Sequence, residues 1–435
     1  MTKWFHICFS LFAVWLIVPP SAYAEERGDL LAANPPAAAA SPVEIAPRES
    51  LPESKKKLSL FKYGRSGLQI GEKDKGRFSA EVNIRSQMRF SSPFRDAPRR
   101  ESQFGGEGEQ DFRFQRARFK VEGHAFTPWI DYKYEHDLVG NRLLDAQMTI
   151  GKWESLQFRF GQWKADYSRE RMDSSGKQQF ADRSIVNRTF TLDRQKGATV
   201  LGRLMKGTVG DSRYYVGVFA GNGRGFRTPS GAAKLDHSDG SPLVMARYQW
   251  NFLGRDVGHS QSDLEYNEKP AAALAFGAAR NRSRYTRFSS SGGGQLDGFE
   301  PGQPGQYALR QFMEEATMKY RGLSLQHELH WKSVEDTVTT NMTHMRGAYV
   351  QAGYFFHHML PQIPKQLEVG TRYAMVDPNR GQVNDRQKEL AFVVNWFFDG
   401  HRDKLTFDTS RFSLAQREGS DLKDTQVRLQ WDVSF

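Results

Sequence analysis

The chain has 435 residues, a formal net charge of +11 and a mean hydropathy of −0.65. Charged residues make up 26% of it and aromatic residues 13%, which excludes a bundle of membrane helices and a disordered chain. The positive charge favours anionic partners such as nucleic acid, anionic lipid or anionic solutes.

Residues 1–24 are predicted to be a secretory signal peptide. Lys3 precedes the apolar run WFHICFSLFAVWLIV, and Ala22-Tyr23-Ala24 fits a small-x-small cleavage site. The alternative is a membrane anchor, although the run is short for a spanning helix. The only cysteine, Cys8, lies in this segment, so we expect a mature chain without disulfides, thiolate metal sites or a cysteine nucleophile.

Residues 25–70 are predicted to be a linker, because this range is rich in Ala, Pro and charge and has no apolar period at its start. From about residue 71 to residue 435 the pattern is that of repeated β-strands. No later apolar run reaches the roughly 18 residues of a membrane helix. If the mature chain lies in a membrane, only a closed barrel satisfies its backbone there.

The stretch RFSAEVNIRSQMRF, residues 77–90, shows the strand pattern most clearly. Its even positions run from Phe78 to Phe90 and are almost all apolar, whereas its odd positions are all polar and include Arg85 and Arg89. A period of two places these two sets on opposite faces of one strand. The same alternation recurs in PWIDYKYEHDL, RLLDAQMTI, LSLQHELHWK, QLEVGTRYAMV and TQVRLQWDVSF.

Two segments break the alternation. In FRFQRARFKVEGHAF, Phe112 and Phe114 are in phase with Arg116 and Arg118, so either the phase slips or the strand leaves the membrane there. In PLVMARYQW (residues 242–250), Leu243 and Met245 fall on the face that should be polar.

These patterns predict an all-β fold, a transmembrane antiparallel β-barrel of about 16 strands between residues 76 and 435. Soluble sandwiches and propellers also use strands of period two. The barrel is favoured because the strands are long, their polar faces carry charges at mid-strand, and aromatic residues such as Trp431 and Phe435 gather at strand ends.

The chain resembles the phosphate-selective porin O and P family of bacterial outer membranes over roughly residues 75–435. The motifs that carry the resemblance are FRFGQWKADYSRERM (158–172), FADRSIVNRTFTLDRQKGATVLG (180–202), FAGNGRGF (219–226), GAYVQAGYFF (347–356), LEVGTRYAMVDP (367–378), ELAFVVNWFFDG (389–400) and the terminal Phe435. One departure is that ADYSRE lacks a proline often found after the turn that follows Gly161. The paired basic loop residues of the phosphate channels have no clear counterpart here.

The resemblance implies that a basic segment after one strand folds inward and narrows the lumen. Arginine forks there can replace the hydration of an oxyanion with charge-assisted hydrogen bonds. The alternative is a solvated surface loop. The candidate constriction residues are Arg169, Arg171, Lys177, Arg183, Arg188 and Arg194.

A second group of cations is predicted to line the lumen wall: Arg85, Arg89, Arg116, Arg118, Lys133 and Arg372. A column of these side chains would draw anions along the wall. The alternative is that they pair across strands with lumen acids such as Glu81, Glu122 and Glu368 and serve stability only.

Signals for an enzyme are weak. His327 and His330 are three residues apart on a predicted strand, so they face opposite sides and cannot share a metal ion. GRLMKGT (202–208) lacks the lysine after the second glycine of a phosphate loop. We therefore expect no catalytic residue, metal or cofactor.

The leading hypothesis is a passive outer-membrane porin for inorganic anions, phosphate first, exported with a cleaved signal peptide. Its expected partners are those anions, outer-membrane lipid and lipopolysaccharide, with no nucleic acid. The resemblance also implies a homotrimer. The alternatives are a non-selective general porin, a barrel that sheathes a periplasmic partner such as an electron carrier, and an outer-membrane hydrolase.

Overall fold

The computed structural model describes residues 61–435, apart from residues 65, 66, 73–75, 95, 107, 109, 222, 224–240, 283–285, 287, 288, 293 and 383. The expected signal peptide and the expected linker up to residue 60 lie outside the described residues. The chain divides into two units, Met1–Lys57 and Leu58–Phe435, and the structure described below belongs to the second.

Eighteen strands form one antiparallel sheet. Two short ones, β1 (Phe61–Gly64) and β2 (Gly67–Ile70), pair as a hairpin. The other sixteen are β3 (Ala80–Ser92), β4 (Asp111–His124), β5 (Ile130–Asp137), β6 (Arg142–Trp153), β7 (Leu156–Lys164), β8 (Arg194–Leu204), β9 (Ser212–Phe219), β10 (Ser241–Trp250), β11 (Ala271–Arg282), β12 (Tyr307–Tyr320), β13 (Leu323–Asp336), β14 (Met342–Tyr354), β15 (Leu367–Asp377), β16 (Gln387–Asp399), β17 (Asp403–Leu414) and β18 (Leu422–Ser434). The short helices are η1 (Glu101–Gln103), α2 (Arg169–Met172), α3 (Ile185–Phe190) and η2 (Phe356–His358).

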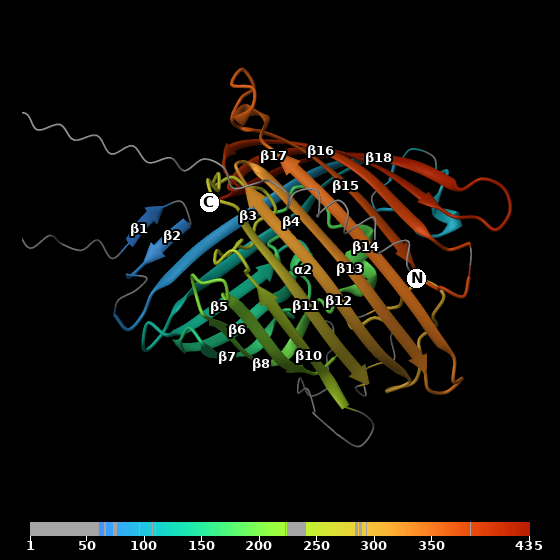
Figure 1. The fold of residues 1–435 in the computed structure, drawn as a ribbon, viewed down its shortest axis with the longest axis horizontal. Coiled ribbons are helices and arrows are strands. Elements are labelled where there is room, and N and C mark those ends of the chain that lie inside the picture. The colour runs from blue at the N-terminus through green and yellow to red at the C-terminus, as the bar shows by residue number, and fades with distance from the viewer. Residues whose placement is uncertain are drawn as a thin grey trace, which may run out of the picture. The chain divides into compact units, whose positions relative to one another are not determined.

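The sixteen longer strands close into a barrel (Figure 1). Each pairs with its two neighbours in sequence, and the ring is closed by the pairing of β3 with β18, in which Arg89 lies opposite Gln430. The predicted antiparallel barrel of about 16 strands is therefore confirmed. The sheet begins before residue 71, because the hairpin of β1 and β2 falls within the expected linker.

The hairpin covers an edge that β18 leaves open. The backbone of Phe435 exchanges two hydrogen bonds with Ile84, at 2.8 and 2.9 Å. Beyond this point β2 continues along β3, with Leu68 opposite Val82. Unpaired strand edges attract other chains, so β2 protects this part of the barrel. We call the end of the barrel that holds Phe435 the base and the opposite end the rim.

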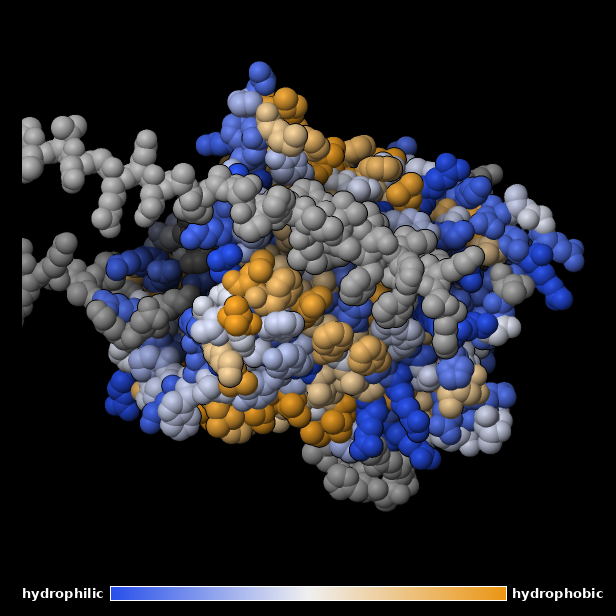
Figure 2. Space-filling model, in the orientation of Figure 1, coloured by the Kyte–Doolittle hydropathy of each residue, from blue (hydrophilic) through white to orange (hydrophobic). Residues whose placement is uncertain are grey.

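The two faces of the strands differ as the alternation predicts. On β16, Leu390, Phe392 and Val394 point outward and are exposed, whereas Glu389 and Asn395 point inward and are buried. Figure 2 shows hydrophobic side chains gathered over the strands and hydrophilic ones towards the two ends. The inward-facing polar residues are nevertheless buried, so other parts of the chain must cover them.

Both breaks in the alternation have a structural cause. The pairing of β3 with β4 shifts register between Gln87 and Met88, which is a β-bulge at Gln115. The bulge places Phe112 and Phe114 outward while Arg116 and Arg118 still face the lumen, so the predicted slip of phase is confirmed.

Leu243 and Met245 do face the interior, where both are buried in an apolar cluster with Trp163, Tyr167 and Phe219. Part of the barrel interior is therefore a packed core, and the expectation of a polar face throughout is wrong at these positions.

One glycine of the family motif is required by the geometry of the barrel. Gly161 has φ = +118°, and a Cβ atom there would lie 2.1 Å from the carbonyl oxygen of Ala146 on β6. We expect Gly161→Ala to lower the free energy of unfolding by at least about 1–3 kcal/mol. The midpoint of urea unfolding in detergent, followed by heat-modifiable gel migration, measures this. Gly106→Ala is the matched control, because a Cβ atom there meets nothing within 4 Å; equal midpoints for the two variants would contradict the expectation.

Candidate pore constriction

Residues 165–193, which we call the constriction loop, connect β7 to β8 and lie inside the barrel. Tyr167, Phe180 and Phe190 of this loop are at most 1% exposed. Each packs in an apolar cluster with inward-facing residues: Tyr167 against Met245, Phe180 against Val393, and Phe190 against Tyr349. The expectation of an inward-folded loop is confirmed, and the loop rests on the wall formed by β10–β17.

Carboxylates of that wall accept hydrogen bonds from the backbone of the loop. Four such bonds measure 2.6–3.0 Å, and they run from the N–H groups of Arg169, Glu170, Ala181 and Ile185 to Glu315, Glu328, Asp408 and Glu389, respectively. A buried N–H group without an acceptor is costly, and a charged acceptor makes the strongest bond. These carboxylates therefore fix the path of the loop.

Each of the four carboxylates also contacts a basic side chain of the wall, which is an arginine in three cases and a histidine in the fourth. Glu315 pairs with Arg247 at 2.5 Å, Glu389 with Arg372 at 2.5 Å, and Asp408 with Arg428 at 2.6 Å. The fourth, Glu328, lies 2.9 Å from the ring of His330. The pairing makes burial of these carboxylates tolerable, because an unpaired buried charge would be expensive.

Cations of the wall complete the attachment by donating to carbonyl groups of the loop. The donors and acceptors are Arg89 to Ala181 at 2.6 Å, Arg372 to Asp182 at 3.0 Å, Lys404 to Gln178 at 2.6 Å and Lys332 to Thr189 at 3.2 Å. The loop is thus bound through its N–H and its C=O groups to the surrounding strands.

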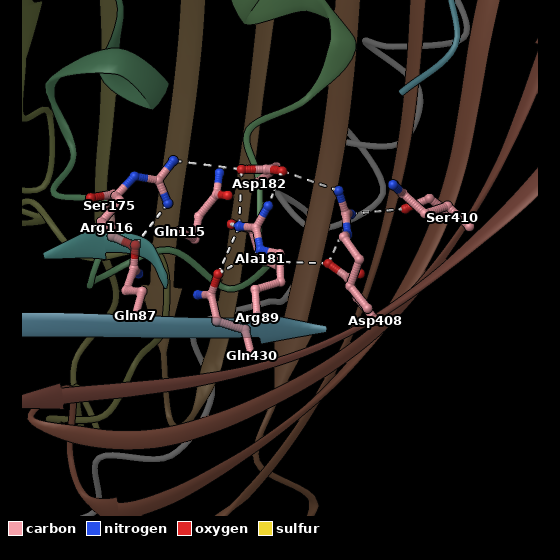
Figure 3. A network of polar contacts seen from close by, with 12 residues as sticks. Gln87, Arg89, Gln115, Arg116, Ser175, Ala181, Asp182, Asp408, Ser410 and Gln430 are labelled. Atoms are coloured by element: carbon pink, nitrogen blue, oxygen red, sulfur yellow. Dashed lines mark hydrogen bonds and ion pairs between the residues drawn. The ribbon is translucent and has the colours of Figure 1, made fainter. Parts of the chain in front are cut away.

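Asp182 is the centre of an arginine cluster (Figure 3). Arg89 binds its carboxylate at 2.5 Å, Arg428 at 3.4 Å and Arg116 at 3.6 Å. Burial alone would raise the pKa of Asp182, but the three arginines together hold that pKa well below its usual value. The carboxylate is therefore charged at neutral pH and neutralises part of the cluster.

Most predicted site residues are paired with acids. In the constriction group, Arg169 lies 4.0 Å from Asp173, Arg171 pairs with Asp193, and Arg194 pairs with Asp145 at 2.5 Å. In the wall group, beside Arg89, Arg116 and Arg372, the pairs are Arg85 with Asp432 at 2.9 Å, Arg118 with Glu135 at 2.8 Å and Lys133 with Asp145 at 2.8 Å. The alternative of pairing with lumen acids thus describes the wall group, although the expected acids Glu81, Glu122 and Glu368 are not among the partners.

Three predicted residues, Lys177, Arg183 and Arg188, make no ion pair within 4.0 Å among the described residues. Arg183 donates instead to the carbonyl groups of Glu170 at 2.7 Å and Asp173 at 2.8 Å. Burial lowers the pKa of Arg183, and Glu170 partly offsets this. Lys177 is exposed, and Arg188 is part-buried towards the rim. These three side chains are therefore the cations of the loop that lack an ion pair with the described acids.

Strands β4 and β5 form the part of the wall that the loop leaves accessible. The side chains of Lys120, Glu122 and Lys133 are 27%, 38% and 28% exposed, whereas Glu315 and Glu328 on the opposite wall are 1% exposed. The inward-facing positions of β4 beyond the bulge and of β5 hold only polar or charged residues. The accessible charged side chains of the interior therefore lie on these strands, beside the constriction loop.

A second segment, residues 251–270, folds into the base of the barrel and was not foreseen from the sequence. We call it the strap. Gln261 accepts a hydrogen bond from the backbone N–H of Gln179 at 2.9 Å, and its own N–H donates to the carbonyl group of Lys177 at 3.0 Å. Ser262 donates to Glu368 on β15 at 2.8 Å. The strap thus reaches from β10 to β15 and supports the constriction loop from the side of the base.

The expectation about the histidines of β13 is confirmed. His330 faces inward and is buried, whereas His327 lies on the outer face of the strand. Among the described residues, no three His, Cys, Asp or Glu side chains are grouped so as to hold a metal ion. No helix in the same part of the chain is both long and apolar enough to cross a membrane.

Comparisons with known proteins agree with this architecture. The model of the family described as phosphate-selective porin O and P matches residues 87–253 and 299–418. The chain is similar to the solved structure of an anion-selective porin from Comamonas acidovorans, with 9% identity and a TM-score of 0.52 over 82% of this chain and 99% of that one. It is also similar to OprB of Pseudomonas putida, with 10% identity and a TM-score of 0.53 over 82% and 94% of the two chains. A comparison with curated protein sequences gives no match.

Glu170, whose carboxylate accepts two hydrogen bonds from Ser184, gives the loop a pH dependence. Burial and the neighbouring Glu328 raise the pKa of Glu170 from 4.5 to about 7. Between pH 4.5 and about pH 7, Glu170 therefore keeps its proton in the folded protein and loses it in the unfolded chain. The resulting stabilisation is full below about pH 4.5, falls as the pH rises to about 7, and is absent above it.

We expect Glu170→Gln to remove this contribution, because glutamine keeps the hydrogen-bonding pattern of the protonated acid. The difference in free energy of unfolding between variant and parent should change by about 1–3 kcal/mol from pH 4.5 to pH 8, in favour of the variant at high pH. Urea titrations in detergent at several pH values measure it, with Glu154→Gln on an exposed turn as the control. A pH-independent difference would count against the assigned protonation.

Proposed function

The chain belongs to the phosphate-selective porin O and P family, and from this premise we propose that it passes inorganic oxyanions, phosphate first among them, by passive diffusion. It is an outer-membrane porin, a channel-forming protein. The observation that supports the anion preference is that Lys177, Arg183 and Arg188 make no ion pair among the described residues. The other nine predicted cations each lie within 4.0 Å of an acid. Cations at a constriction favour anions.

Arg183 is the residue that we expect to meet the solute. Its guanidinium group is held by two backbone carbonyl groups, which fix its position without an ion pair. An oxyanion that reaches it loses part of its hydration shell and gains charge-assisted hydrogen bonds in return. Arg116 and Arg118 on β4 supply further positive charge nearby, reduced by their acidic partners.

A second candidate is a general porin with weak selectivity. Nine of the twelve predicted cations face an acid within 4.0 Å, which favours this reading because paired charges attract passing anions weakly. The sheathing of an electron carrier has less support, since the constriction loop and the strap occupy the interior along β10–β17.

Export by the signal peptide of residues 1–24, assembly as a homotrimer and contact with lipopolysaccharide remain part of the proposal. They rest on the sequence pattern and on the family. We also assign the base to the periplasmic side, because outer-membrane barrels place their short turns there. The turns of the base are as short as residues 321–322 between β12 and β13.

Single-channel recording in planar bilayers tests the proposal. In a KCl gradient we expect a reversal potential of the sign that anion flow gives, and we expect phosphate to block the chloride current. In Arg183→Gln the reversal potential should move towards zero, and the phosphate concentration for half block should rise by about tenfold.

Arg255→Gln removes the same charge from the strap, where the side chain binds only the carbonyl group of Pro270, and should leave both readouts unchanged. A large conductance without selectivity in the parent protein would favour the general porin. A folded barrel that conducts nothing would exclude both channel functions.

A further inference from the structure

A cavity of about 250 Å³ opens between the hairpin strand β2 and strands β3–β6, near the base. Its lining includes Gln69, Glu81, Glu122, His124, Asp131 and Lys133. It lies on the accessible side of the interior, since its lining includes Glu122 and Lys133, whose side chains are part-exposed. We call it the base vestibule.

Most of the charged groups among the described lining residues of the vestibule are acidic. Three carboxylates line it, on Glu81, Glu122 and Asp131, and Lys133 is the one ammonium group among its described lining residues. Lys133 is already bound to Asp145 at 2.8 Å and to Glu135 at 3.4 Å. Acids outside the lining therefore neutralise its charge.

Two of the carboxylates are directly opposed. Glu81 and Glu122 are cross-strand partners in the pairing of β3 with β4, and both face the lumen. Like charges in this position destabilise a sheet unless a positive group lies between them. Lys120 contacts Glu122 at 2.7 Å from the rim side, but no ion pair to Glu81 is made by the described residues.

His124 provides an independent sign of a ligand. It is 1% exposed, lines the same cavity, and shares the inward face of β4 with Glu122. Its Nδ1 atom lies 2.7 Å from the hydroxyl group of Ser79, whereas its Nε2 atom is buried without a hydrogen-bond partner in the described structure. Buried polar atoms are rarely left unpaired. With the proton on Nδ1, donated to Ser79, Nε2 is an acceptor that an N–H group would satisfy.

We propose that the base vestibule binds a small organic cation with N–H donors, of the diamine or polyamine class. Such a molecule offers charge to Glu81 and Glu122 together and an N–H donor to His124. A single metal ion fits less well, because the described residues hold no group of three ligands close enough to share one. The site is separate from the arginines of the constriction and does not require phosphate selectivity.

The test is sided block of the single-channel current by putrescine and by spermidine. We expect block from the side of the base at lower concentration than from the side of the rim. In the double variant Glu81→Gln, Glu122→Gln the concentration for half block should rise on the order of tenfold. Glu154→Gln is the matched control, since this acid lies on a turn of the base outside the vestibule and pairs with Lys206.

Two further measurements separate charge from hydrogen bonding. Tetraethylammonium has the charge but no N–H donor, so it should block more weakly than putrescine. His124→Phe should weaken the block by putrescine more than that by tetraethylammonium, with heat-modifiable migration confirming that each variant is folded. Absence of amine block, equal block from the two sides, or equal block of the parent and the double variant would overturn the proposal. The reversal potential in KCl without amine reports separately on the anion preference.

Discussion

The interior of this barrel depends on hydrogen bonds between the backbone of the constriction loop and charged side chains of the wall. A loop that leaves the sheet and enters the lumen loses its water, so its N–H and C=O groups need partners from the strands. Glu315, Glu328, Asp408 and Glu389 supply the acceptors, and wall cations such as Lys404 supply donors. The path of the loop follows from the positions of these side chains.

This attachment explains why a strongly basic chain has few uncompensated cations inside. Arg372 and Arg428 each bind a carboxylate that also holds the loop, and Arg89 binds Asp182 of the loop itself. Their charges position the constriction and are largely cancelled for a passing solute. The positive charge that remains belongs to Lys177, Arg183 and Arg188, and Arg183 is held in place by two backbone carbonyl groups.

The strap and the hairpin lie at the base of the barrel, on different parts of its wall. The strap reaches from β10 to β15 at the base and supports the constriction loop through Gln261. The hairpin extends β3 and contributes Gln69 to the vestibule. The acidic side chains of the vestibule, Glu81, Glu122 and Asp131, therefore lie near the base, apart from the arginines of the constriction loop.

The sequence by itself determined the barrel, because a period of two is a local property of each strand, and the run from Phe78 to Phe90 already separates a lipid face from a lumen face. It also located the inward loop, through its resemblance to a family, and even the break at Gln115. Only the tertiary structure decided which cations are compensated. Arg89 and Asp182 are 93 residues apart in sequence, and no local pattern predicts that their side chains meet. The strap was missed for the same reason: residues 251–270 have no period, and their place inside the barrel is set by partners on distant strands.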